Sequence, residues 1–173
     1  LERIAQESVE RDHVPIMEIL TAYLRQNAPA DGAVPNPLPE WQPLPDDASP
    51  EQRAAHLAAR KKRFGDISDF DSAARRWAET LTGDTITQTA IRVIGRRDAR
   101  QIARERADTR YGDAGYRLDL RATNLQAVDV AGLDLSRARL DGARMEGADL
   151  NEARVRTAAV TSDLSRVKGL TQE

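Results

Sequence analysis

A repeat of five residues runs through Leu118–Val160 and constrains the fold more than any other feature of the sequence. One apolar position recurs every five residues without interruption, and its members are Leu120, Leu125, Val130, Leu135, Leu140, Met145, Leu150, Val155 and Val160. A second series lies two positions earlier and consists of Leu118, Thr123, Val128, Leu133, Ala138, Ala143, Ala148, Ala153 and Ala158. A period of five fits neither ordinary element, because residues five apart drift around a helix and alternate between the faces of a strand.

Each group of five residues is therefore interpreted as one structural unit. Within a unit the two apolar residues flank one polar residue, as in Ala148-Asp149-Leu150, which is the pattern of a short strand with its outer residues pointing inward. The two remaining residues, such as Asp141-Gly142, suit a corner. We expect the chain to wind so that its apolar positions share one axis.

The units Ala138-Arg139-Leu140, Ala143-Arg144-Met145 and Ala148-Asp149-Leu150 resemble the pentapeptide-repeat family, whose motif is Ala-(Asp/Asn)-Leu-x-x. The resemblance covers nine consecutive units and implies a right-handed, four-sided β-helix. The expected fold class is α+β, with an N-terminal α-helical segment capping a short right-handed quadrilateral β-helix, a pentapeptide-repeat solenoid. The inward-facing residues would be Leu120, Leu125, Val130, Leu135, Leu140, Met145, Leu150 and Val155, together with Ala138, Ala143, Ala148 and Ala153.

The resemblance also implies that residues twenty apart stack on the outside of successive turns. Three such pairs have opposite charges, namely Asp119 with Arg139, Arg121 with Asp141, and Asp134 with Arg154. The first turn carries the large residues Leu118 and Leu133 where the next turn has alanines. We therefore expect the N-terminal helices to cover that end of the coil.

The sequence divides into a helical region, residues 1–110, and a repeat region, residues 111–173. Two helices are expected within residues 1–27, followed by a proline-rich connector, residues 28–48, in which Trp41 would attach to the helical surface. Further helices are expected at 50–63, 69–81 and 85–95, the first starting from a Ser49 cap and the last from a Thr85–Gln88 capping box. Residues 96–110 predict a short, solvated, self-paired helix, and residues 163–170 an irregular last unit closing the open end.

The sequence contains no pattern typical of a catalytic or metal site. Its two histidines, His13 and His56, have no histidine or cysteine at ligand spacing, and it has no cysteine, glycine-rich phosphate loop or nucleophile elbow. The coil carboxylates alternate with arginines, as on a solvated face. We therefore expect no enzymatic activity, no cofactor and no small-molecule substrate.

These features favour a non-enzymatic scaffold that binds a protein partner through exposed residues of the coil, among them Arg139, Arg144, Asp149 and Arg154. One alternative is a regulatory domain of a membrane-anchored protein, because Leu1–Ala5, Arg11–His13, Ile16–Tyr23 and Ile91–Arg97 resemble a bacterial subset of the family that often has membrane helices upstream. Another alternative, also implied by the resemblance, is a DNA mimic that binds gyrase. The formal net charge of −2, with 26 basic and 28 acidic residues, argues against a polyanion mimic and against nucleic-acid binding. The expected location is cytoplasmic, with membrane association only through sequence upstream of Leu1.

Overall fold

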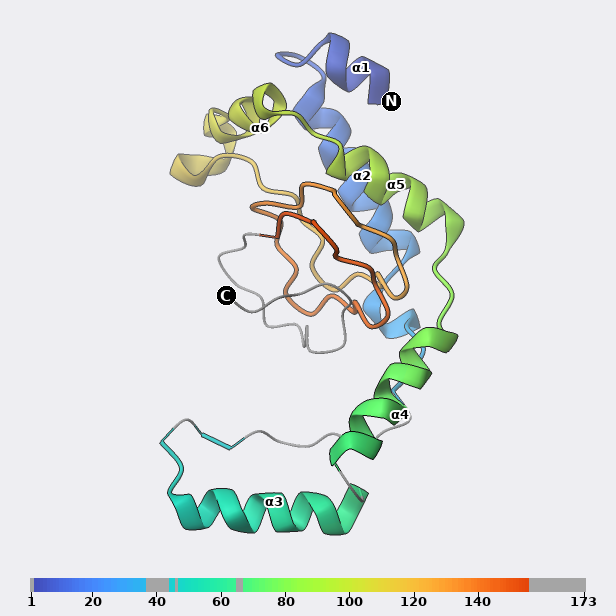
Figure 1. Ribbon diagram of the computed structural model, residues 1–173. Helices are drawn as coiled ribbons and strands as arrows, with labels where there is room; N and C mark the ends of the chain where they lie inside the picture. The colour runs from blue at the N-terminus through green and yellow to red at the C-terminus, as the bar shows by residue number, and fades with distance from the viewer. Residues whose placement is uncertain (1, 37–43, 46, 65–66, 156–173) are drawn as a thin grey trace. The chain divides into compact units, whose positions relative to one another are not determined.

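A computed structural model of the chain describes residues 2–36, 44–45, 47–64 and 67–155. The helices are α1 (Glu2–Glu7), α2 (His13–Asn27), α3 (Pro50–Phe64), α4 (Ile67–Thr80), α5 (Thr85–Gly95) and α6 (Ala99–Arg106), with short 3-10 helices η1 (Ala30–Gly32) and η2 (Thr109–Ala114) (Figure 1). The chain forms two compact units, Leu1–Ala33 with Leu81–Glu173, and Val34–Thr80. The expected boundary at residue 110 falls inside the first unit.

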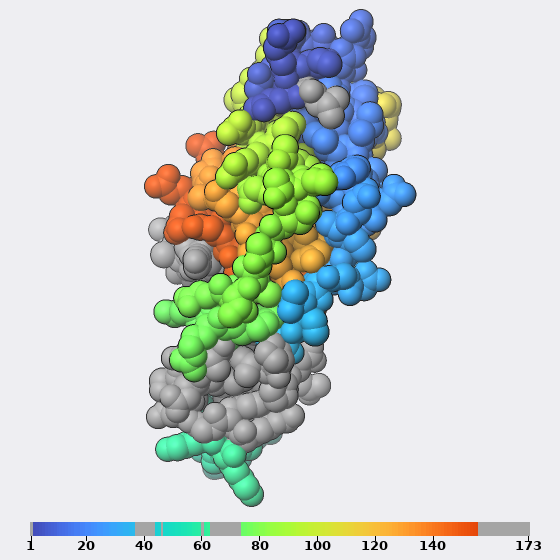
Figure 2. Space-filling model, turned by 90° about the vertical axis from the view of Figure 1, so that its right-hand side faces the viewer, coloured from blue at the N-terminus to red at the C-terminus, as the bar shows by residue number. Residues whose placement is uncertain are grey.

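In the first unit, α2 and α5 pack against each other and lie over the repeat segment (Figures 1 and 2). Helix α2 buries Ile16, Leu20 and Leu24, which follow one another at helical spacing on a single face. Helix α5 buries Ile91 and Ile94 completely. The two helices therefore form part of one apolar core with the repeat segment.

The start of α5 differs from the sequence expectation. The cap residue is Asp84, in an extended conformation, and its carboxylate accepts a hydrogen bond from the Thr87 backbone N–H at 2.7 Å. The prediction of a Thr85–Gln88 capping box is therefore wrong, because Asp84, one position before Thr85, supplies the acceptor. Helix α6 has a complete capping box, formed by Asp98 and Gln101.

The second unit contains α3 and α4, which pack against each other. The expected Ser49 cap of α3 is confirmed, because the Gln52 backbone N–H donates to Oγ of Ser49 at 3.2 Å and the Ser49 N–H donates to Oε1 of Gln52 at 2.7 Å. Helix α4 buries Ala74 and Ala78. The expectation for Trp41, and that for residues 163–170, lie outside the described residues.

In the repeat segment, residues twenty apart lie side by side. Isolated parallel bridges join Asp119 to Arg139, Asn124 to Arg144, Asp129 to Asp149, and Asp134 to Arg154. At the first bridge, the Arg139 N–H donates to the Leu118 carbonyl at 2.8 Å, and the Leu120 N–H donates to the Arg139 carbonyl at 2.9 Å. The expected register of twenty residues per turn is thus confirmed by the backbone hydrogen bonds.

The expected α+β class with a β-helix is wrong, because the described part of the chain contains helices and isolated bridges but no strand and no sheet. The physical reason lies at the corners, where every fifth residue has a positive φ: Ala122, Ala127, Gly132, Arg137, Gly142, Gly147 and Glu152. A two-residue turn begins two positions after each parallel bridge residue, so consecutive bridging residues do not accumulate into a strand. The repeat segment is a coil of turns joined by single bridges.

Backbone carbonyls at the ends of α2 and α5 accept hydrogen bonds from the edge of the first turn of the coil. The Ala28 carbonyl accepts from the Asn124 N–H at 2.7 Å, and the Gly95 carbonyl accepts from the Asp134 N–H at 2.8 Å. The edge of the coil is therefore covered, as an unpaired edge needs to be. Leu118 is fully buried and Leu133 is partly buried against the core, as expected for residues beneath helices.

The Gln88 side chain covers a third position on the same edge. Its Nε2 donates to the Asp129 carbonyl at 2.7 Å, and its Oε1 accepts from the Asp129 N–H at 2.8 Å. A primary amide presents one donor and one acceptor side by side, like a peptide group. Gln88 thus takes the place that a further turn of backbone would occupy.

Candidate functional site

The coil has four sides, each holding one parallel bridge between successive turns. Side 1 comprises residues 118–122 and 138–142, side 2 residues 123–127 and 143–147, side 3 residues 128–132 and 148–152, and side 4 residues 133–137 and 153–155. The expected interaction residues Arg139, Arg144, Asp149 and Arg154 lie on sides 1, 2, 3 and 4 respectively. The structure therefore does not bring them together on one surface.

The residues expected to face inward lie at the centre of the coil. Leu120, Leu125, Val130, Leu135, Leu140, Met145, Leu150, Ala138, Ala143 and Ala148 are buried, and Ala153 and Val155 are partly buried against the same cluster. Their packing fixes the backbone of each side, and with it the direction of the outward side chains. The surface of the coil is therefore held on a rigid support.

An open cleft of about 730 Å³, here called the arginine cleft, lies between side 1, α2 and η2. Its charged lining residues are Glu18, Arg25, Arg117, Asp119, Arg121, Arg139 and Asp141. Of the four expected interaction residues, Arg139 lines this cleft. Side 1 is the place where the coil, α2 and η2 contribute polar side chains to one concave surface.

Asp119 is the most heavily paired carboxylate in the cleft. One oxygen lies 2.7 Å from Nε of Arg121, and the other lies 2.5 Å from a terminal nitrogen of Arg25. The hydrogen bond from Arg121, together with the charge of Arg25, holds the pKa of Asp119 below its usual range. Asp119 thus pairs with Arg121 and Arg25, and its carboxylate makes no ion pair with Arg139 among the described residues.

The inner wall of the cleft contains Thr21 and Tyr116, both buried. Their hydroxyl oxygens are 3.4 Å apart, and burial raises the pKa of Tyr116 to about 12. The exposed ring of Tyr111 meets Tyr116 edge to face, with ring centroids 5.2 Å apart. The cleft therefore combines charged groups with an aromatic surface.

Arg117 and Arg137 meet at the corner where side 4 passes into side 1. They are twenty positions apart, and Nε of Arg117 donates to the Arg137 carbonyl at 3.0 Å. The Arg137 guanidinium donates to the Ala114 carbonyl, which also lines the cleft. Its other terminal nitrogen is buried without a hydrogen-bond partner among the described residues. Burial, followed by the charge of Arg106, holds the pKa of Arg137 below its usual range.

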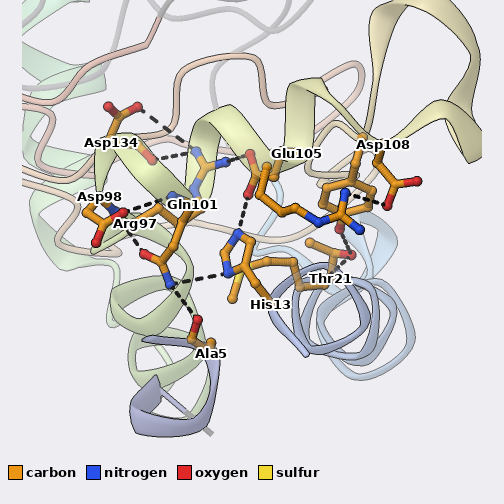
Figure 3. Close-up of polar contacts among 12 residues, drawn as sticks. Ala5, His13, Thr21, Arg97, Asp98, Gln101, Glu105, Asp108 and Asp134 are labelled. Atoms are coloured by element: carbon orange, nitrogen blue, oxygen red, sulfur yellow. Dashed lines mark hydrogen bonds and ion pairs between the residues drawn. The ribbon is translucent and has the colours of Figure 1, made fainter. Parts of the chain in front are cut away.

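Behind the cleft, a buried polar network joins α2 and α6 to the coil (Figure 3). Nε2 of His13 lies 2.9 Å from Oε1 of Glu105, and a terminal nitrogen of Arg97 lies 2.5 Å from Oε2 of the same carboxylate. Arg97 also donates to the Asp134 carbonyl at 2.8 Å. Both carboxylate oxygens of Glu105 are thereby satisfied inside the protein.

Gln101 fixes the tautomer of His13. Its Oε1 accepts from the Asp98 N–H at 2.9 Å, so its Nε2 is the donor to the Ala5 carbonyl at 3.1 Å and to Nδ1 of His13 at 3.2 Å. Since Nδ1 accepts, the imidazole proton sits on Nε2 and is donated to Glu105. His13 is fully buried, so its ring acts within the protein interior and does not reach the cleft surface.

This network was not predicted from the sequence. Residues 96–110 contain many arginines and were expected to form a solvated helix, whereas Arg97, Gln101 and Glu105 are buried. Gln101 and Glu105 lie four positions apart on one face of α6, and this spacing beside the Asp98 cap was the available signal. The sequence gives no sign of their partner His13.

The described ranges contain no group of three histidine, cysteine, aspartate or glutamate side chains arranged to hold a metal ion. None of the helices in those ranges is long and apolar enough to cross a membrane. The charged groups of the arginine cleft can form ion pairs and hydrogen bonds with a ligand, and the tyrosines can supply apolar contact.

Comparison with known proteins identifies the repeat segment. Residues 119–156 match the family model described as pentapeptide repeats, in eight copies. No curated protein and no solved structure matches the chain. The matched residues include every bridge and every corner described above. Residues 119–156 therefore form a segment of pentapeptide repeats.

Proposed function

We propose that the protein is a non-enzymatic scaffold that binds a protein partner through the arginine cleft. The observation that carries the proposal is the composition of the cleft, in which the coil, α2 and η2 together present charged and aromatic side chains on one concave surface. Repeat architectures commonly use such a surface to bind other proteins. Arginine and tyrosine are enriched at protein interfaces, and both types line this cleft.

The burial pattern supports a binding role over a catalytic one. His13, a residue that could act as a general base, is fully buried and hydrogen-bonded on both ring nitrogens. The carboxylate of Asp119 is paired with two arginines, which lowers its pKa and its basicity. These groups are arranged to hold the structure and to present charge.

The distribution of ion pairs gives no support to mimicry of DNA. Asp119, Asp134 and Glu146 on the coil each lie within an ion pair with an arginine. A mimic of a nucleic acid needs regularly spaced unpaired negative charge along a rod. The scaffold proposal therefore places the partner at the cleft and not along the acidic residues of the coil.

Affinity capture from the source cell tests the proposal, with the intact chain as bait. Three baits are compared: the unmodified chain, Arg139→Gln in the cleft, and Arg144→Gln on side 2 as a matched control. Both arginines are half-buried members of neighbouring bridges. A partner retained by the unmodified chain and by Arg144→Gln, and depleted by Arg139→Gln, would support the proposal. Equal recovery with all three baits, or no retained protein, would contradict it.

A further inference from the structure

Three neighbouring arginines, Arg117 and Arg139 in the lining of the cleft and Arg137 beside Arg117, form no ion pair with a carboxylate of the described residues. Arg117 donates through Nε to a backbone carbonyl, Arg137 donates to the Ala114 carbonyl, and Arg139 is in no ion pair with a described residue. One terminal nitrogen of Arg137 is buried with its hydrogen-bonding capacity unused. This nitrogen is closed to solvent and Arg137 does not line the cleft, so the cations open to a ligand are Arg117 and Arg139.

The other charges of the cleft have counterparts. Asp119 pairs with Arg25 and Arg121. The charge of Asp141 acts on Arg121, and that of Glu18 acts on Arg110 at the edge of η2. The unbalanced positive charge is therefore concentrated at Arg117, Arg137 and Arg139.

The charge of the Glu105 carboxylate behind this corner acts on Arg137, but Glu105 forms its ion pairs with other residues. Its two oxygens are occupied by His13 and Arg97 at 2.9 and 2.5 Å. Arg97 and Arg106 lie close enough to Arg137 for their charges to oppose its protonation. The corner thus has an excess of cations over anions.

We propose that the arginine cleft receives an acidic peptide segment of a protein partner, whose carboxylates bind Arg117 and Arg139 and whose apolar side chains lie against Tyr111. The inference rests on the proposed function, since it names the chemistry of the partner at the same cleft. Carboxylates match the fork of donors on a guanidinium, and the exposed Tyr111 ring offers apolar contact beside them.

A peptide fits the cleft better than a nucleic acid. Glu18, Asp119 and Asp141 line the same surface and would repel a continuous row of phosphates. A peptide can place one or two carboxylates beside Arg117 and Arg139, and neutral or basic groups beside Glu18 and Asp141. A volume of about 730 Å³ open to solvent also suits an extended chain more than a single small anion.

A displayed library of random twelve-residue peptides, selected on the intact chain, tests the inference. We expect the selected peptides to be enriched in aspartate and glutamate over the unselected library. Replacement of the acids in a selected peptide by asparagine and glutamine should weaken binding about tenfold or more, because the charge-assisted bonds are lost. Selected peptides without an acidic excess would overturn the inference.

Protein variants locate the binding site of the selected peptides. Arg117→Gln and Arg139→Gln should each weaken binding about tenfold, whereas Arg144→Gln should change it less than about twofold. Circular dichroism spectra and thermal melting of each variant establish that it is folded. Equal affinity for the unmodified chain and Arg139→Gln would overturn the inference, and so would complete displacement of the peptide by millimolar inorganic phosphate or by a short DNA duplex.

The two proposals fail in different ways. If capture of a partner depends on Arg139 but the selected peptides have no acidic excess, the scaffold proposal is supported and the acidic-peptide inference is contradicted. Acidic peptides that bind at the corner, combined with partner capture that ignores Arg139, contradict the scaffold proposal at this cleft.

Discussion

Nε2 of His13 lies 2.9 Å from Oε1 of Glu105, and the two residues are separated by 92 positions in the sequence. Both side chains are completely or almost completely buried, with exposed fractions of 0 and 1 %. The pair connects α2 to α6, and through Arg97 it reaches the backbone of side 4. This contact links α2 and α6 to the coil within the first unit.

Truncation of Glu105 should therefore destabilise the protein strongly. Glu105→Ala leaves the Arg97 guanidinium buried without its carboxylate, and we expect a loss of about 3–5 kcal/mol in the free energy of unfolding. Chemical denaturation of the intact chain measures this loss. Glu7→Ala is the control, since Glu7 pairs with Arg3 on the exposed surface, where an ion pair contributes about 0–1 kcal/mol. Similar losses for the two variants would contradict the role given to Glu105.

Gly95 should not tolerate a side chain. A Cβ atom at this position would lie 2.6 Å from Cβ of Leu133, so Gly95→Ala requires α5 or side 4 to move. We expect a loss of about 1–3 kcal/mol in the free energy of unfolding, as for other overpacked sites. Gly32→Ala is the matched control, because nothing lies within 4 Å of the added atom. A Gly95→Ala variant as stable as Gly32→Ala would show that α5 is not packed closely on the coil.

The Gln88 side chain should stabilise the edge of the first turn of the coil. Gln88→Leu keeps the size of the side chain and removes both hydrogen bonds to the Asp129 backbone, at an expected cost of about 1–2 kcal/mol. Arg92→Gln, which removes an exposed ion pair with the Asp129 carboxylate, should cost less than about 1 kcal/mol. Hydrogen exchange at the Asp129 amide checks the assignment, since it should accelerate in Gln88→Leu and stay slow in Arg92→Gln.

The helices were largely predictable, because their apolar spacing and caps are local. The Ser49 cap and the two N-terminal helices follow from residues within a few positions of one another. The twenty-residue register of the coil was also predictable, since a strict five-residue period repeats the same unit. The absence of strands from the described part of the coil was not predictable, because it follows from the corner geometry, which limits each side to one parallel bridge between turns.

The polar parts of the candidate site were the least predictable. The burial of Glu105 depends on His13, a partner far away in the sequence, and local charge alone indicated a solvated helix. The grouping of Arg117 with Arg137 follows from the twenty-residue register, but the position of η2 against them does not. The sequence predicted that Gln88 completes a capping box at the start of α5. Asp84 is equally close in sequence to the first turn of α5, and its carboxylate is the acceptor that caps the helix.

The stability of the protein should fall at alkaline pH through Tyr116. Burial raises the pKa of Tyr116 to about 12, above the ordinary value of 10 that applies to an unfolded chain. Its stabilising contribution is therefore fully present below pH 10 and is lost as the pH rises from about 10 to about 12. An ultraviolet titration of the phenols should show a step near pH 12 that is absent in Tyr116→Phe. A variant with the same alkaline profile as the unmodified chain would contradict this assignment.

The most direct test of the scaffold proposal is calorimetric titration of the intact chain with its purified captured partner. We expect saturable binding that weakens about tenfold or more in Arg117→Gln and in Arg139→Gln, and that stays within about twofold in Arg144→Gln. Equal affinities for all four proteins would contradict the assignment of the partner to the arginine cleft.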